Sequence, residues 1–298
     1  MERIKNMWDT DLALEARDLA SAARGDTPGV ESRRYENFGV TVDEIRIINE
    51  KGERALGKRK GTYITLTLPE GFLYDDMLFE DCANAISAEI AKLVKERDVL
   101  VAGLGNTAVT ADSLGPLTAD GVISTRHILK NMLPDSFGRV ASVKCGVMGQ
   151  TGIESADIIR GVCSQARPKA VVTVDALTAR SITRLAKTVQ ISDCGISPGS
   201  GVGNTRAELS KETIGLPVTA IGVPTIVGGA TLVADTAHEL CNADRNELYK
   251  LSKDKLSGFF VTPKDIDIIS ERMSRLISVS FNMFAHGLEF AEAVSFMN

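Results

Sequence analysis

The amino-acid sequence predicts an α/β protein: a three-layer sandwich with a mostly parallel central sheet and a smaller appended β-containing region. Short apolar runs rich in β-branched residues recur at 99–102, 170–174 and 218–223, which is typical of strands buried on both faces. Segments with apolar residues at helical spacing alternate with the strands over most of the chain, and this order favours helices packed on both faces of one sheet. The 298 residues, of which 44% are hydrophobic, are ample for a large core.

The N-terminal part of the chain predicts two helices and two strands. Leucines and alanines after Thr10 or Asp11, either of which can cap a helix, line a weak amphipathic face. Two segments with alternating polarity predict strands, and the charged, turn-rich stretch between them predicts a loop over 50–60. In order, the predicted elements are a helix over 12–20, strands over 40–49 and 61–69, and a helix over 80–97.

The remainder of the chain alternates between strands and helices, with glycine and proline at the boundaries. The glycine-dense segments 146–152 and 195–204 predict tight turns or loops. In order, the predicted elements are strand 99–102, helix 117–132, strand 139–144, helix 153–164, strand 170–174, a helix that ends at 185, strands 188–192 and 218–223, and helices 231–242 and 265–290.

Charge and cysteine content exclude several classes of protein. The net charge of −5 is spread along the chain, so no basic surface for nucleic acid is indicated. The five cysteines are odd in number and lack CxxC spacing, which argues against a disulfide framework and a zinc ribbon. The N-terminus is charged throughout, and we find no apolar run of about 18 residues. We therefore expect a cytoplasmic protein that binds neither nucleic acid nor membrane.

Two aspartates follow predicted buried strands. Asp112 lies after Gly103 and Gly105, near a predicted helix N-terminus, and Asp175 follows the run 170–174. Parallel strands joined by right-handed crossovers end at the same edge of a sheet, so both carboxyl groups are expected to face one crevice. Two nearby carboxyl groups do not ionise together easily, and sharing one proton provides a general acid and a general base. This is the chemistry of a water-activating peptidase; a helix-capping role alone is the open alternative for Asp112.

Five ordered blocks give the chain a resemblance to the germination proteases of spore-forming bacteria. These blocks are TDLALEAR, GLGNTAVTADSLGP, GVMGQTGIES, DALTARS, and QISDCGISPGSGVGN followed by IGVPTIV. The resemblance implies a fold similar to hydrogenase maturation peptidases and catalytic roles for Asp112 and Asp175. The chain departs from the family pattern at two places. The family has a proline where this chain has Ala111, and an Asp-Ala pair where it has Gly228-Gly229.

The resemblance also implies a biological role. Germination proteases are zymogens of the developing spore core that remove a short propeptide by self-cleavage, degrade small acid-soluble spore proteins and form tetramers. Because cleavage in the family follows an acidic residue, the resemblance predicts a cut between Asp11 and Leu12. The chain would then consist of a propeptide, 1–11, and a peptidase domain, 12–298.

The two aspartates have different expected roles. A helix N-terminus lowers a carboxylate pKa, so Asp112 is the candidate for the ionised base. Asp175, at the end of an apolar strand, is the candidate for the protonated acid, and the reverse assignment stays open. Arg180, on the predicted helix after Asp175, is a candidate partner for an acidic substrate side chain; a surface salt bridge is the alternative.

The glycine-rich turns are candidate substrate-binding segments. Without a Cβ, glycine lets backbone N–H groups approach an extended peptide or a developing oxyanion, although simple tight turns are an equal alternative. The candidate substrate-binding glycines are Gly146, Gly149, Gly152, Gly199, Gly201 and Gly203.

Three rival functions have weaker support. The segment 195–199 matches the G-x-S-x-G nucleophile elbow, with Asp235 and His238 after it, but Pro198 removes an N–H that the elbow needs. The three histidines are scattered, so no cofactor and no metal site is predicted; a metal-assisted peptidase like the hydrogenase maturation enzymes remains an alternative. The segment GLGNTAVTADSLG matches neither the G-x-G-x-x-G motif nor the P-loop, so nucleotide binding has weak support. The non-enzyme alternative is an α/β scaffold whose aspartates only cap helices.

Overall fold

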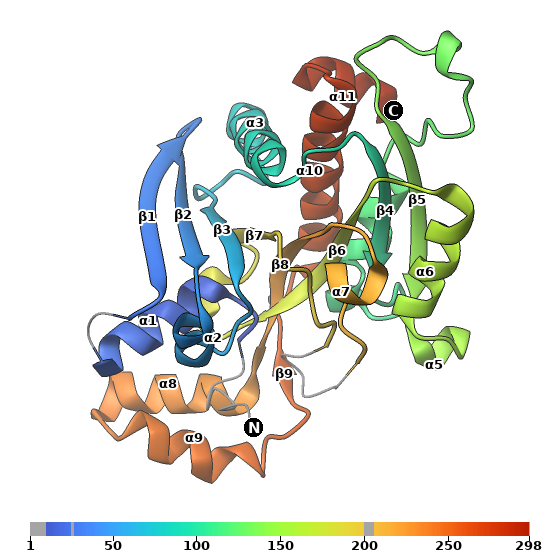
Figure 1. Ribbon diagram of the computed structural model, residues 1–298. Helices are drawn as coiled ribbons and strands as arrows, with labels where there is room; N and C mark the ends of the chain where they lie inside the picture. The colour runs from blue at the N-terminus through green and yellow to red at the C-terminus, as the bar shows by residue number, and fades with distance from the viewer. Residues whose placement is uncertain (1–9, 25–26, 200–205, 298) are drawn as a thin grey trace.

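One sheet organises the whole chain. The computed structural model describes residues 10–24, 27–199 and 206–297, and its nine strands form one sheet in the order β1-β2-β3-β7-β8-β6-β4-β5, with β9 paired to β8 (Figure 1). The strands are β1 Val30–Asn37, β2 Val40–Ile47, β3 Gly61–Thr67, β4 Asp98–Leu104, β5 Arg139–Gly146, β6 Ala170–Ala179, β7 Thr188–Ser192, β8 Val218–Gly228 and β9 Phe260–Val261.

The sheet is parallel in one half and antiparallel in the other. Strands β5, β4, β6 and β8 are parallel neighbours, whereas β1, β2, β3 and β7 pair antiparallel with their neighbours. The α/β class is thus confirmed, and the expected appended β region is the antiparallel half. It continues the same sheet instead of forming a separate one, because β7 joins β3 to β8.

Helices cover both faces of the sheet (Figure 1). The helices are α1 Ala13–Arg24, α2 Glu50–Leu56, α3 Asp76–Leu93, α4 Leu114–Asp120, α5 Met148–Thr151, α6 Ser155–Ala166, α7 Lys211–Ile214, α8 Gly229–Cys241, α9 Arg245–Lys253, α10 Ile266–His286 and α11 Phe290–Met297. Helices α3, α10 and α11 share one apolar core with the sheet, and α6 contributes to a second core on the other face. Helix α1 lies beside β2 and β3 in the antiparallel half. Helix α8 contacts β8, and α9 packs against α8 (Figure 1).

Strand β4 shows how one segment builds two cores. Val99 and Val101 belong to the cluster with α3 and α10, whereas Leu100, Ala102 and Leu104 belong to the cluster with α6. Successive side chains of a strand point to opposite faces, so a continuous apolar run is needed where both faces are covered. Each fully buried side chain of this size contributes roughly 1.5–3 kcal/mol to folding.

The predicted helix over 117–132 is wrong. Helix α4 begins at Leu114 and ends at Asp120, and the chain then runs beside β5. The Asn282 side chain of α10 binds both the carbonyl of Gly121 and the N–H of Ile123, and the N–H groups of 125 and 126 both donate to Val140 O. These contacts satisfy the backbone in a loop conformation, so the helix has no advantage there.

Three further predictions differ from the structure. The expected loop over 50–60 contains helix α2, which begins after the N-cap Asn49 and ends at Gly57 with a φ of 63°. Strand β1 was not predicted, because most of its side chains are exposed and polar. The helix expected from Asp175 to 185 is absent, since β6 runs on to Ala179 and is followed only by a 3-10 turn, Ile182–Arg184.

Candidate active site

Asp112 lies just beyond the carboxyl end of β4. A 3-10 turn, Thr110–Asp112, precedes α4, and the turn is held by side chains from two other elements. Thr225 of β8 donates to the carbonyl of Ala111 at 2.7 Å, and Ser270 of α10 donates to that of Thr110 at 3.2 Å. Asp112 is therefore placed at the sheet edge, as predicted, and is fixed from β8 and α10.

Glycines let this turn pack directly on the strands. Gly105 has a φ of +114°, and a Cβ there would lie 2.1 Å from the carbonyl oxygen of Asp112. A Cβ on Gly115 would lie 2.2 Å from Leu104 O and 2.3 Å from Val174 O. The two glycines thus bring Asp112 and the start of α4 against both β4 and β6.

Asp175 lies within β6, not at its end as predicted. The strand continues to Ala179 because β8 pairs alongside it as far as Val227, with a register shift between Leu177 and Thr178. Asp175 is only 5% exposed, and its Oδ1 accepts the Ala176 N–H at 3.0 Å. A carboxyl group is thus placed in the sheet interior.

The two aspartates interact electrostatically. Burial is the main cause that raises the pKa of Asp175 well above its ordinary value, and the charges of Asp112 and Asp11 raise it further. Burial also raises the pKa of Asp112 to about 6, while Arg206 and the Asn106 N–H act in the opposite direction. The lowered pKa expected for Asp112 is therefore wrong in direction, because burial outweighs the helix N-terminus.

The charge of Asp112 is one of the causes that raise the pKa of Asp175, so ionisation of Asp112 favours the protonated form of Asp175. A pair that carries one proton and one negative charge has the state needed for a base and an acid. The roles expected for the two acids stay a prediction.

The N-terminal segment is bound against β6 close to this pair. The N–H of Asp11 donates to Thr178 O at 2.9 Å, and the Thr178 N–H donates to the Asp11 carboxylate at 2.9 Å. Leu12 is fully buried with Leu177, Ala179 and Val227. The predicted cleavage residues Asp11 and Leu12 are thus brought to the same end of the sheet as the aspartates.

Three polar side chains hold the segment in place, two of them buried and one, Lys58, half-buried. Lys58 Nζ donates to Thr10 O at 2.9 Å, and Gln190 binds the main chain of both Asp11 and Ala13. Glu15 accepts the hydroxyl of Thr10 and the N–H groups of Arg180 and Ser181, at 2.7 and 3.0 Å.

Arg180 binds an acidic residue of this chain. Its guanidinium lies 2.6 Å from Asp235 Oδ1, and Arg245 contacts the same carboxylate at 2.9 Å. His238 belongs to α8, as Asp235 does, and its Nδ1 lies 2.8 Å from Ala243 O. Asp235 and His238 are therefore occupied by other partners and do not form the arrangement that a serine hydrolase needs.

One of the glycine-rich turns lies beside the loop that carries Asp112. Gln150, within the turn that contains Gly146, Gly149 and Gly152, donates to Asn106 Oδ1 at 2.6 Å, so this turn lies beside the segment that leads to Asp112. Gly199 has a φ of +70°. Gly201 and Gly203 lie outside the described residues.

Sequence reasoning missed four polar residues at this site: Lys58, Gln190, Arg206 and Glu15. Gln190 had the clearest signal, since it is a polar residue in the middle of the apolar strand β7. Lys58 opens the short basic run Lys58-Arg59-Lys60 and Arg206 is a single basic residue after a loop. Neither gave a distinct signal, because such residues are usually solvated.

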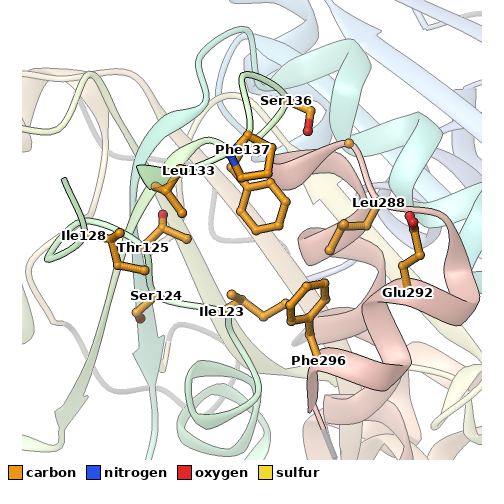
Figure 2. A pocket seen from close by; sticks show the side chains of 12 residues that line it. Ile123, Ser124, Thr125, Ile128, Leu133, Ser136, Phe137, Leu288, Glu292 and Phe296 are labelled. Atoms are coloured by element: carbon orange, nitrogen blue, oxygen red, sulfur yellow. The ribbon is translucent and has the colours of Figure 1, made fainter. Parts of the chain in front are cut away.

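Two cavities among the described residues lie away from the aspartates. One, of about 580 Å³, is lined mostly by apolar side chains from the loop before β5 and from α11, including Ile123, Phe137 and Phe296 (Figure 2). The other, of about 520 Å³, lies near Phe72 and Ile269. Among residues 10–24, 27–199 and 206–297, no three His, Cys, Asp or Glu side chains gather in a way that would hold a metal ion. In the same part of the chain, no helix has the length and hydropathy needed to cross a membrane.

Comparison with known proteins finds several germination proteases that resemble the chain. The sequence profile described as germination protease matches residues 9–248. A germination protease of Caldanaerobacter subterraneus is 41% identical over 305 aligned residues, which cover 92% of this chain and 93% of that protein. One from Clostridium tetani is 36% identical, covering 97% and 99%.

A solved structure is also similar. A NiFe hydrogenase maturation protease from Thermococcus kodakarensis matches 65% of this chain and 97% of its own, at 18% identity and a TM-score of 0.35. At that score the likeness supports no inference.

Proposed function

Since the chain belongs to the germination protease family, we propose that it is an endopeptidase in which Asp112 and Asp175 together activate water. We also propose that its first substrate is its own N-terminal segment, cut between Asp11 and Leu12. The activity of a peptidase on protein substrates follows from the family; the two aspartates and the cleavage site are our assignments.

The observation that carries the proposal is that Asp112, Asp175 and Asp11 lie close enough for the charges of Asp112 and Asp11 to raise the pKa of Asp175, with the uncut N-terminal segment bound to β6. Asp112, with a pKa of about 6, is ionised near neutral pH, and burial together with the charge of Asp112 favours the protonated form of Asp175. In the proposed reaction, Asp112 takes a proton from water as the water oxygen bonds to the Asp11 carbonyl carbon. Asp175 gives its proton to the leaving nitrogen of Leu12, and the C–N bond breaks.

The position of the N-terminal segment supports self-cleavage. The charge of Asp11 contributes to the raised pKa of Asp175, so these residues lie near each other in the uncut chain. The segment is also bound by its main chain, through the Asp11 N–H and the carbonyl groups of Thr10 and Asp11, as a peptidase substrate is expected to be. Residues 1–11 are then a propeptide and the chain a zymogen.

The remaining assignments rest on the family resemblance. We propose that the cut protein degrades small acid-soluble spore proteins in the germinating spore core and that it acts as a tetramer. Gly146, Gly149, Gly152, Gly199, Gly201 and Gly203 are proposed to bind the substrate main chain. For Arg180, the ion pair with Asp235 favours a structural role, and contact with an acidic substrate side chain requires that pair to open.

Self-cleavage of the purified full-length chain tests the proposal. At a pH above about 6, where Asp112 is ionised, intact mass should fall by residues 1–11, and the new N-terminus should be Leu12. Asp112→Asn and Asp175→Asn should each stay at full length, whereas Asp120→Asn, which alters an exposed ion pair with Lys144, should be cut normally. Any other new N-terminus would refute the cleavage site, and cutting of both active-site variants at the parent rate would refute the roles of the two acids.

A further inference from the structure

Gln190 binds the main chain on both sides of the bond between Asp11 and Leu12. Its Nε2–H donates to the carbonyl oxygen of Asp11 at 3.1 Å, and its Oε1 accepts the N–H of Ala13 at 2.7 Å. The side chain is 7% exposed, so these two contacts are made out of bulk water. One carboxamide thus brackets the peptide unit that we propose is cut.

The sheet places Gln190 in the same row as Asp175. Gly222 of β8 is the register partner of Gln190 on one side and of Asp175 on the other. Neighbouring strands are about 4.8 Å apart, so the Cα atoms of Gln190 and Asp175 are separated by about two strand spacings across a glycine. Register partners project to the same face, so both side chains reach over the same part of β8.

The space over the glycine between them is filled by a side chain of β6. A Cβ on Gly222 would lie only 2.5 Å from the Leu177 side chain, so Leu177 occupies the space above this glycine. Leu177 in turn packs in the same apolar cluster as Leu12. The residue on the leaving side of the bond is therefore held in the apolar cluster that also covers Gly222.

The hydrogen bond to the Asp11 carbonyl has a direct chemical meaning. The carbonyl oxygen gains negative charge when water adds to its carbon, and a donor already aimed at that oxygen stabilises the charge. Strand β7 has neighbours on both sides, β3 and β8, which fixes the donor better than a loop would. The acceptor contact to Ala13 N–H prevents the carboxamide from rotating away.

We propose that Gln190 is the residue that binds the scissile carbonyl during removal of the N-terminal segment, with its Nε2–H as the oxyanion donor and its Oε1 as the anchor. This inference rests on the proposed self-cleavage between Asp11 and Leu12. A purely structural role, in which Gln190 only holds the first turn of α1, is the competing account.

Two substitutions distinguish the donor contact to Asp11 O from the acceptor contact to Ala13 N–H. Gln190→Met keeps the length of the side chain and removes both contacts, whereas Gln190→Glu keeps an acceptor for Ala13 N–H and removes the donor to Asp11. Thr65→Val is the matched control, because Thr65 is the register partner of Gln190 on β3, is fully buried and has a hydroxyl with no hydrogen-bond partner.

The experiment measures the rate of loss of residues 1–11 by intact mass, together with the thermal unfolding midpoint of each uncut protein. Both Gln190 variants should be cut at least about 10²-fold more slowly than the parent. Their unfolding midpoints should be close to that of the parent. Thr65→Val should be cut at the parent rate.

The outcomes discriminate between this inference and the proposed function. A parent rate in Gln190→Met or in Gln190→Glu, with Asp175→Asn uncut, overturns the role of Gln190 alone. Loss of the fold in both variants overturns it in favour of the structural role. A parent protein that is never cut at Asp11, at any pH, overturns the proposed self-cleavage and this inference with it.

Discussion

Replacing Asp112 by asparagine should stabilise the fold at neutral pH while abolishing cleavage. Burial raises the pKa of Asp112 from 3.8 to about 6, so at neutral pH the folded protein holds a carboxylate that is better solvated in the unfolded chain. Asparagine has nearly the same shape and does not titrate. The variant therefore removes an unfavourable ionisation from the folded state.

The magnitude follows from linkage between protonation and folding. Below about pH 4 the carboxyl group is protonated in both states and has no pH-dependent effect. As the pH rises to about 6, the unfolded chain has already released its proton, so the parent loses stability at about 1.4 kcal/mol per pH unit. Over about two units the free energy of unfolding of the parent should fall by about 3 kcal/mol relative to Asp112→Asn, and stay constant above that pH.

Urea unfolding of both proteins across this pH range measures the difference directly. Intact mass is recorded at each pH, so that only uncut protein is compared. A difference in unfolding free energy that is constant from acid to neutral pH, or one in which the parent gains stability as the pH rises, would refute the burial of an ionising Asp112.

Three further predictions concern the same site. Gly105→Ala places a Cβ 2.1 Å from the carbonyl oxygen of Asp112 at a positive φ. Urea unfolding should show a larger loss of unfolding free energy than in Gly71→Ala, where the space is open and only the backbone conformation costs about 1–2 kcal/mol. Equal losses would contradict the packing described. Leu12→Ala should lower the free energy of unfolding by about 2–5 kcal/mol, because the side chain is fully buried; a change near zero would show that the segment is not packed there. Self-cleavage should continue in a chelator, and its loss with recovery on adding a divalent metal would favour the metal-assisted alternative.

The sequence was sufficient where each local pattern had one structural solution. The β-branched run before Gly103 is a strand buried on both faces, and both aspartates became candidates because a carboxylate follows each apolar run. The pattern failed where tertiary contacts decided the outcome. β6 runs past Asp175 because β8 continues beside it, and the loop after α4 is held by Asn282 from α10.

The site was only partly predictable for the same reason. Gln190 and Asp175 share a row through Gly222, and that register depends on the strand order, which no single segment of sequence specifies. The direction of the Asp112 pKa also depends on the surrounding burial, which the local helix-terminus argument omitted.

The rate of self-cleavage as a function of pH tests the central claim most directly. If Asp112 acts ionised and Asp175 acts protonated, the rate should rise as the pH passes about 6 and fall again at higher pH, once Asp175 loses its proton. A rate that is independent of pH, or that is highest where Asp112 is protonated, would contradict the account.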